Sequence, residues 1–402
     1  MRRIGRLWRA GLSLLPAAIA MWPALGSAAP YRPTGDTVVL ERLPVRPSDP
    51  VQRELRGLRA AHRANPADAD AALVLAQRYF NLTLDSGDPR YVGYAEAALS
   101  AWQALTPANV PVDVLVMRAQ LLQYRHQFTQ ALGLLNAALA QDPKHVRALA
   151  WRAAVNMVVA RYEAVGADCS RLKGLGERLL GAGCAAYLDA TLGKAGAAYA
   201  SLGAALASEP GARSTLRLWT LTVLAEIARR LGDVAAAEAH YRSAMDLDDS
   251  DQYVLAAYAE LLGHQRRWDE IVSLLRRWER SDVLVLSLAR AERALGKPEA
   301  GTRAASLRAR FADAALRGDT ANAQDEAWFR LEFEADPKGA LALALQNWSV
   351  QKEPRDAEIV LQAALAARDR SSAAPVLAWM TRTGIEDPRL RDLAARLAQV
   401  SR

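Results

Sequence analysis

The sequence has little of what a sheet protein needs. Only 6% of its 402 residues are aromatic. Alternation of apolar and polar residues, the pattern of a half-buried strand, is almost absent, and the one extended-looking run is Thr37 to Leu40. Alanine is abundant instead, and small side chains suit helices that pack closely against one another. We therefore predict a chain built from helices.

Signatures of catalysis and of metal binding are also missing. The five histidines are scattered, and none forms the His-Glu-x-x-His spacing of a zinc site. No Gly-x-Ser-x-Gly elbow occurs, and Gly296-Lys297-Pro298 lacks the neighbours of a phosphate-binding loop. The aspartates between Asp246 and Asp251 lack the Gly and Glu of a calcium loop, which favours a helix-capping turn. The sequence thus predicts a protein that is not an enzyme and has no cofactor or metal site.

No apolar run is long enough for an ordinary membrane span. The longest lies between Gly11 and Gly26, shorter than the ~20 residues that a spanning helix needs. Four arginines precede it and Ser27-Ala28-Ala29 follows it, as in a cleavable export signal. We predict a signal peptide over residues 1–28, a periplasmic location and no transmembrane span in the mature chain. An uncleaved membrane anchor is the alternative.

The excess of positive charge is smaller than it first appears. The formal charge of +7 includes the four arginines of the predicted signal, so +3 remains on the mature chain. A mildly basic exported protein gives no reason to expect a nucleic-acid partner.

What the sequence does contain is a repeat of 34 residues. Apolar and small residues recur at this spacing in two pairs of segments: Leu115, Ala119, Phe128 and Leu135 with Leu149, Ala153, Tyr162 and Cys169; and Leu221, Ala225, Ala228 and Tyr241 with Leu255, Ala259, Leu262 and Leu275. A fixed period of this length indicates a stack of helix-turn-helix units.

This pattern resembles the tetratricopeptide repeat (TPR) family. The resemblance is strongest over residues 112–281, in units at 112–145, 146–178, 179–212, 218–251 and 252–281. It implies an all-α fold, a right-handed superhelical solenoid of antiparallel helix pairs, over residues 49–402. Repeats on either side of 112–281 are degenerate, and a capping helix is expected near 388–400. Residues 29–48 contain several prolines, so we expect an extended N-terminal arm there.

The resemblance also implies a function. TPR solenoids bind proteins or peptides in a concave groove lined by the first helix of each pair, so we expect a scaffold or adaptor of the cell envelope, with possible peripheral envelope association. The alternative is an accessory scaffold for polysaccharide export or outer-membrane assembly. By repeat position, the groove residues would be Asp113, Gln120, Gln123, Arg147, Tyr187, Trp219, Glu226, Arg229, Tyr253 and Glu260. Any of them could instead merely pack between helices.

The two cysteines, Cys169 and Cys184, fall in consecutive helices of the predicted stack. An exported protein reaches an oxidising compartment where disulfides persist. We predict a bridge between them. Two buried thiols that never meet are the alternative, because free cysteine often serves as a small core residue.

Overall fold

The computed structural model of the chain describes residues 35, 38 and 49–400. The predicted signal peptide (1–28) and nearly all of the predicted arm (29–48) lie outside these residues. The chain divides into two units, residues 1–53 and 54–402. In the first unit, the Asp49 side chain accepts a hydrogen bond from the backbone N–H of Val51 at 2.9 Å and starts helix α1 (Pro50–Ala64).

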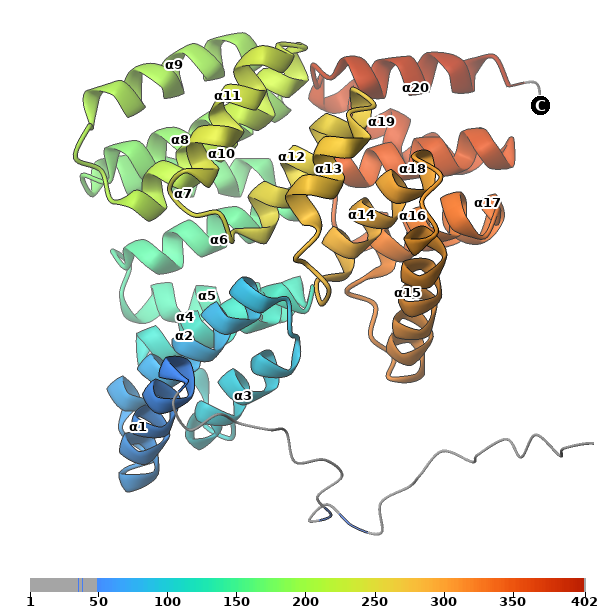
Figure 1. Ribbon diagram of the computed structural model, residues 1–402. Helices are drawn as coiled ribbons and strands as arrows, with labels where there is room; N and C mark the ends of the chain where they lie inside the picture. The colour runs from blue at the N-terminus through green and yellow to red at the C-terminus, as the bar shows by residue number, and fades with distance from the viewer. Residues whose placement is uncertain (1–34, 36–37, 39–48, 401–402) are drawn as a thin grey trace, which may run out of the picture. The chain divides into compact units, whose positions relative to one another are not determined.

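The second unit is helical throughout its described part and contains no strand there, as predicted (Figure 1). Its helices follow one another as antiparallel pairs joined by short turns, the arrangement of a TPR solenoid. The repeat pairs are α2 (Ala69–Ser86) and α3 (Arg90–Ala98); α4 (Val112–Tyr124) and α5 (Phe128–Gln141); α6 (Val146–Val158) and α7 (Tyr162–Gly174); α8 (Arg178–Thr191) and α9 (Ala195–Ser208); α10 (Ser214–Leu231) and α11 (Val234–Met245); α12 (Gln252–His264) and α13 (Trp268–Leu275). The short 3-10 helices η1 (Ser100–Trp102) and η2 (Pro107–Asn109) separate α3 from α4.

The C-terminal third is also helical. It contains α14 (Asp282–Ala294), α15 (Glu299–Leu316), α16 (Ala323–Phe333), α17 (Pro337–Val350), α18 (Pro354–Ala367), η3 (Ser371–Ala373), α19 (Ala374–Thr383) and α20 (Pro388–Ala398). Side chains of α14 to α20 share one apolar core that includes Trp348 and Trp379. Among the described helices, none is both long and apolar enough to cross a membrane.

The small residues of the repeat explain how closely the helices pack. Ala119, Ala153, Ala225 and Ala259 occupy the same position of four units, and each is at most 3% exposed. A larger side chain there would push neighbouring helices apart, because protein interiors are close-packed. The 34-residue period therefore reflects where the helices must touch.

The turn between the two helices of a pair contains a residue with left-handed backbone. Gly193 and Gly232 adopt φ values of 77° and 80°, a conformation that glycine accepts without steric cost. Gly193 has a second constraint, since a Cβ atom there would lie 2.6 Å from the carbonyl oxygen of Gly384. The turn between α8 and α9 thus touches the backbone of the turn between α19 and α20.

The predicted disulfide is confirmed. Cys169 of α7 and Cys184 of α8 are bonded, and their Cα atoms lie 5.5 Å apart. Nearby, Gly181 of α8 faces α7, where an added Cβ would lie 2.5 Å from Cγ of Lys173. On the same helix, a Cβ at Gly183 would lie 2.4 Å from the Trp219 ring of α10. Helix α8 is therefore packed directly against both neighbours through its glycines.

The end of α2 contacts a repeat far along the chain. A Cβ at Gly87 would lie 2.7 Å from the backbone nitrogen of Ser281, just before α14. Asp88 pairs with Arg280 at 3.5 Å, and the Gln252 side chain donates to the backbone carbonyl of Leu84. The first repeats and the α12–α14 region are thus tied together inside the second unit.

Candidate functional site

The residues predicted to line a groove lie on the first helices of the repeat pairs, α4, α6, α8, α10 and α12. We call the surface formed by these residues the helix A face. Its sequence-predicted members are Asp113, Gln120 and Gln123 on α4; Arg147 on α6; Tyr187 on α8; Trp219, Glu226 and Arg229 on α10; and Tyr253 and Glu260 on α12.

The α4–α6 part of the helix A face is accessible and polar. Arg147 lies 3.5 Å from Oδ1 of Asp113 and donates to Oε1 of Gln120 at 3.2 Å. His145 also approaches Asp113, at 3.3 Å. The side chains of Asp113 and Arg147 are 51% and 47% exposed, whereas Gln120 is buried and Gln123 is half-buried. These groups could donate to or accept from the backbone of a bound chain.

The α8–α12 part is aromatic and, apart from Tyr253, which is 50% exposed, more enclosed. The hydroxyl of Tyr253 donates to Oε1 of Glu226, which joins α12 to α10. The Arg230 guanidinium stacks over the Tyr187 ring at 4.8 Å, an attractive cation–π geometry. Trp219 lies against the backbone of Gly183, so its ring packs between α10 and α8. Of the predicted residues, Trp219 therefore has a structural contact of its own.

Another segment of the same chain lies against this part of the face. We call residues 351–356 the crossing segment; 351–353 join α17 to α18, and 354–356 form the first turn of α18. Gln351 and Glu353 have extended backbone conformations. The backbone N–H of Lys352 donates to the carbonyl of Val158 at the end of α6, at 2.8 Å. Arg355 forms an ion pair with Glu260 of α12 at 2.6 Å.

The turn between α19 and α20 reaches the same face. Asp387 lies 3.4 Å from the Arg229 guanidinium, and both side chains are largely buried. The Glu386 carboxylate accepts from the backbone N–H of Ala195, the first residue of α9, at 2.8 Å. The indole N–H of Trp379 donates to the Tyr162 hydroxyl at 2.7 Å. The C-terminal helices are thus held to the repeats by polar contacts.

The crossing segment brings carboxyl groups into an enclosed environment. The pKa of Glu353 is raised to about 8, chiefly by burial and also by the nearby carboxylates of Asp356 and Glu226, while Arg355 and Arg230 oppose the rise. Burial also raises the pKa of Asp356 to about 6, although the side chains of Gln351 and Asn347 donate hydrogen bonds to it. Glu353 therefore holds its proton to a higher pH than an exposed glutamate does.

A polar cavity of about 310 Å³ opens between α12, α14, α18 and α20. Its wall includes Glu260 and His264 of α12, Arg290 of α14 and Arg389 of α20. His264 Nε2 lies 3.3 Å from Oε1 of Glu358 on α18. Burial opposes ionisation of Glu358, but His264 and Arg389 together hold its pKa below the ordinary range.

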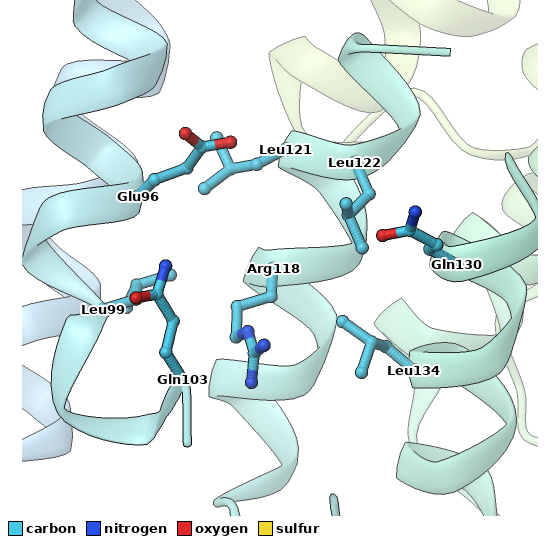
Figure 2. A pocket seen from close by; sticks show the side chains of 8 residues that line it. All are labelled: Glu96, Leu99, Gln103, Arg118, Leu121, Leu122, Gln130 and Leu134. Carbon is cyan, nitrogen blue, oxygen red and sulfur yellow. The ribbon is translucent and has the colours of Figure 1, made fainter. Parts of the chain in front are cut away.

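A second cavity, of about 200 Å³, lies between α3, η1, α4 and α5 (Figure 2). The leucines that line it are Leu99, Leu121, Leu122 and Leu134, and polar side chains of Glu96, Gln103, Arg118 and Gln130 surround them. Its lining suits an apolar side chain. None of the residues predicted for the groove lines this cavity.

The sequence-predicted residues thus supply only one side of a pocket whose other side comes from the crossing segment. Five predicted residues, Tyr187, Glu226, Arg229, Tyr253 and Glu260, line one small polar pocket together with Glu353 and Arg355. Asp113, Gln120 and Arg147 form a separate cluster. The partners on the crossing segment and at Asp387 were not predicted. Pro354 and Pro388 mark helix starts in the sequence, but no periodic signal connects them to the distant helices α10 and α12 that they meet in the fold.

Comparison with known proteins identifies the fold. No protein-family model and no curated protein matches the chain. Among solved structures, the chain resembles the Cut9–Hcn1 hetero-tetramer of the APC/C, with 14% identity over 87% of this chain and 67% of that one and a TM-score of 0.50. Two further structures match with lower TM-scores. Yeast Tom70 has 12% identity over 87% of this chain and 86% of that one, with a TM-score of 0.37. A tetratricopeptide repeat protein from Parabacteroides merdae has 12% identity over 87% of this chain and 93% of that one, with a TM-score of 0.26.

The Cut9–Hcn1 match shows the fold alone, because its identity is low. It agrees with the 34-residue period, the helix pairs and the buried alanines of this chain. Residues 54–400 therefore have the fold of a tetratricopeptide-repeat solenoid.

Proposed function

We propose that this chain is a non-enzymatic scaffold that binds a protein or peptide through its helix A face. One observation carries the proposal: the face already holds another stretch of the same chain, the crossing segment, which is extended at Gln351 and Glu353 and helical from Pro354. Lys352 contributes a main-chain hydrogen bond and Arg355 a side-chain ion pair to it. These are the interactions by which a groove recognises an extended peptide.

The open part of the face is the proposed partner site. The α8–α12 part is occupied by the crossing segment and by Asp387, whereas Asp113 and Arg147 on α4 and α6 remain accessible. A partner chain that continues along the face from the crossing segment would meet these two charges and the side chain of Gln123. Its recognition would therefore be polar.

We further propose that the chain is exported and works in the periplasm. The basic start, the short apolar run and the small residues at 27–29 support an export signal. The disulfide between Cys169 and Cys184 supports an oxidising compartment. N-terminal sequencing of the protein recovered from the source envelope should find a mature chain that begins near residue 29. A chain that retains Met1 would contradict the cleavage.

A matched pair of charge reversals tests the binding face. Arg147 and Arg277 are both exposed arginines paired with exposed aspartates, Asp113 and Asp249. Arg147→Glu changes the helix A face, whereas Arg277→Glu changes a turn near the end of α13. Wild type and both variants are used as bait in an envelope extract, and the bound proteins are identified by mass spectrometry.

We expect a partner that wild type and Arg277→Glu retain and that Arg147→Glu loses. Equal capture by all three proteins, or equal loss in both variants, would contradict the proposed face. Unchanged circular dichroism spectra are required for both variants, so that loss of the fold is not mistaken for loss of binding.

A further inference from the structure

A small cavity of about 20 Å³ between α12, α14, α16 and α18 is lined by Glu260, His264 and Glu358, and Glu260 is also a member of the helix A face. Glu260 and His264 are four residues apart on α12, so they project from the same side of the helix. Glu358 of α18 completes the group. One donor atom from each of the three residues lies within 4.8 Å of the other two. We propose that Glu260, His264 and Glu358 form a binding site for a divalent transition-metal ion of the zinc class.

The donor set has the chemistry of such a site. Zinc accepts imidazole nitrogen and carboxylate oxygen at about 2.0–2.2 Å, most often with four ligands. Around one ion, donor atoms at these distances lie about 3.5 Å apart, so changes in side-chain rotamer are enough to close the group. Three protein ligands leave the fourth position for water. The adjoining cavity of about 310 Å³ supplies the room for it.

Burial favours an ion at this place. The side chains of Glu358, Glu260 and His264 are only 5%, 17% and 25% exposed. Charges that are largely removed from water interact more strongly than charges on the surface. The amide of Gln362 donates to Oε1 of Glu358 at 2.9 Å and orients this carboxylate, as outer-shell hydrogen bonds do for metal ligands in general.

The arginines around the group do not use up its donors. Arg355 contacts Oε2 of Glu260, and Arg389 contacts Oε1 of Glu358. Each carboxylate has two oxygens and about four acceptor positions, so the second oxygen of each can turn to the ion. The ion would compete with Arg389 for Glu358. It would also join α12 of the repeats to α18 of the C-terminal helices.

Zinc titration of the untagged full chain, stripped with a chelator beforehand, tests the site. We expect one zinc ion per chain in a competition assay with a chromophoric chelator. His264→Ala should lower the affinity by at least tenfold. His240→Ala is the matched control, because His240 bonds to Tyr199 in another part of the repeats and should leave the affinity unchanged. Cobalt should give the absorption bands of a four-coordinate site in wild type and not in His264→Ala.

A second variant separates metal loss from loss of the fold. Glu260→Gln keeps the size of the side chain and an oxygen for Arg355, but it removes the charge. Its zinc affinity should also fall by at least tenfold while its circular dichroism spectrum is unchanged. The thermal midpoint should rise with zinc in wild type and His240→Ala only. Wild type that binds no zinc, or equal affinities for His264→Ala and His240→Ala, would overturn the proposal.

Discussion

Opening the disulfide between Cys169 and Cys184 should lower the free energy of unfolding by about 3 kcal/mol. The bridge spans a sequence separation of 15 residues. In the chain-entropy model, a loop of about this length restricts the unfolded chain by roughly 3 kcal/mol at 25 °C. Local opening should increase most in α7 and α8, the two helices that the bridge joins.

The position of the bridge explains why a covalent link matters there. Gly181 and Gly183 lie within α8, where each glycine costs about 1 kcal/mol relative to alanine. Alanine cannot replace either one without a clash, because Lys173 and Trp219 occupy the space of the missing Cβ. Close packing thus requires glycines that weaken α8, and the disulfide offsets part of this loss of stability.

Urea unfolding followed by far-UV circular dichroism measures the effect on oxidised protein and on the same protein kept reduced. Reduction leaves both sulfur atoms in place, whereas Cys169→Ala would add a cavity at a residue that is 2% exposed. A Cys169→Ala, Cys184→Ala double variant is the control, since reductant should not shift its midpoint. Hydrogen exchange should rise first in α7 and α8. Coincident curves for oxidised and reduced protein would refute the reasoning.

Two further predictions concern buried charges at the crossing segment and the α19–α20 turn. Burial raises the pKa of Glu353 to about 8 from its ordinary value of 4.5, so between these values the folded protein holds a proton that the unfolded chain has released. Stability then falls as the pH rises through this window. Glu353→Gln should therefore stabilise the protein by an amount on the order of 2 kcal/mol near pH 8 and have little effect near pH 4. Urea unfolding of wild type and variant at both pH values measures this. A urea midpoint that changes equally at the two pH values would contradict the prediction. Asp387→Asn should keep the cap of α20 but leave Arg229 buried without its carboxylate, at a cost of about 3 kcal/mol. Adding Arg229→Met should recover most of this loss in thermal unfolding, and additive effects in the double variant would show that the two residues are not coupled.

The repeat pairs could be predicted because their signal is local and periodic. The positions of Ala119 and Ala153 need a small residue because neighbouring helices touch there. The positions of Gly193 and Gly232 favour glycine because the backbone is left-handed there. The disulfide could be predicted from the same repeat, because it places the two cysteines on consecutive helices, which lie side by side in a solenoid.

The occupied part of the helix A face could not be predicted in this way. Its contacts are single polar pairs, such as Glu260 with Arg355 and Arg229 with Asp387. Charged residues of this kind are also what an exposed helix surface contains, so their sequence pattern does not reveal a partner far along the chain. The spacing of Glu260 and His264 is visible in the sequence, but Glu358 comes from a helix that only the folded chain brings near.

The contacts between distant parts of the chain also affect how it folds. In a simple repeat array each unit touches only its neighbours, so folding can start anywhere and the ends can fray independently. Here Asp387 meets Arg229 across 158 positions, and Arg280 meets Asp88 across 192. Such contacts form only after long loops close, which raises the contact order and slows folding. They also couple early and late repeats, so we expect the array to unfold in one cooperative transition. The ends of the array should then resist fraying, and deletion of single repeats should destabilise the rest.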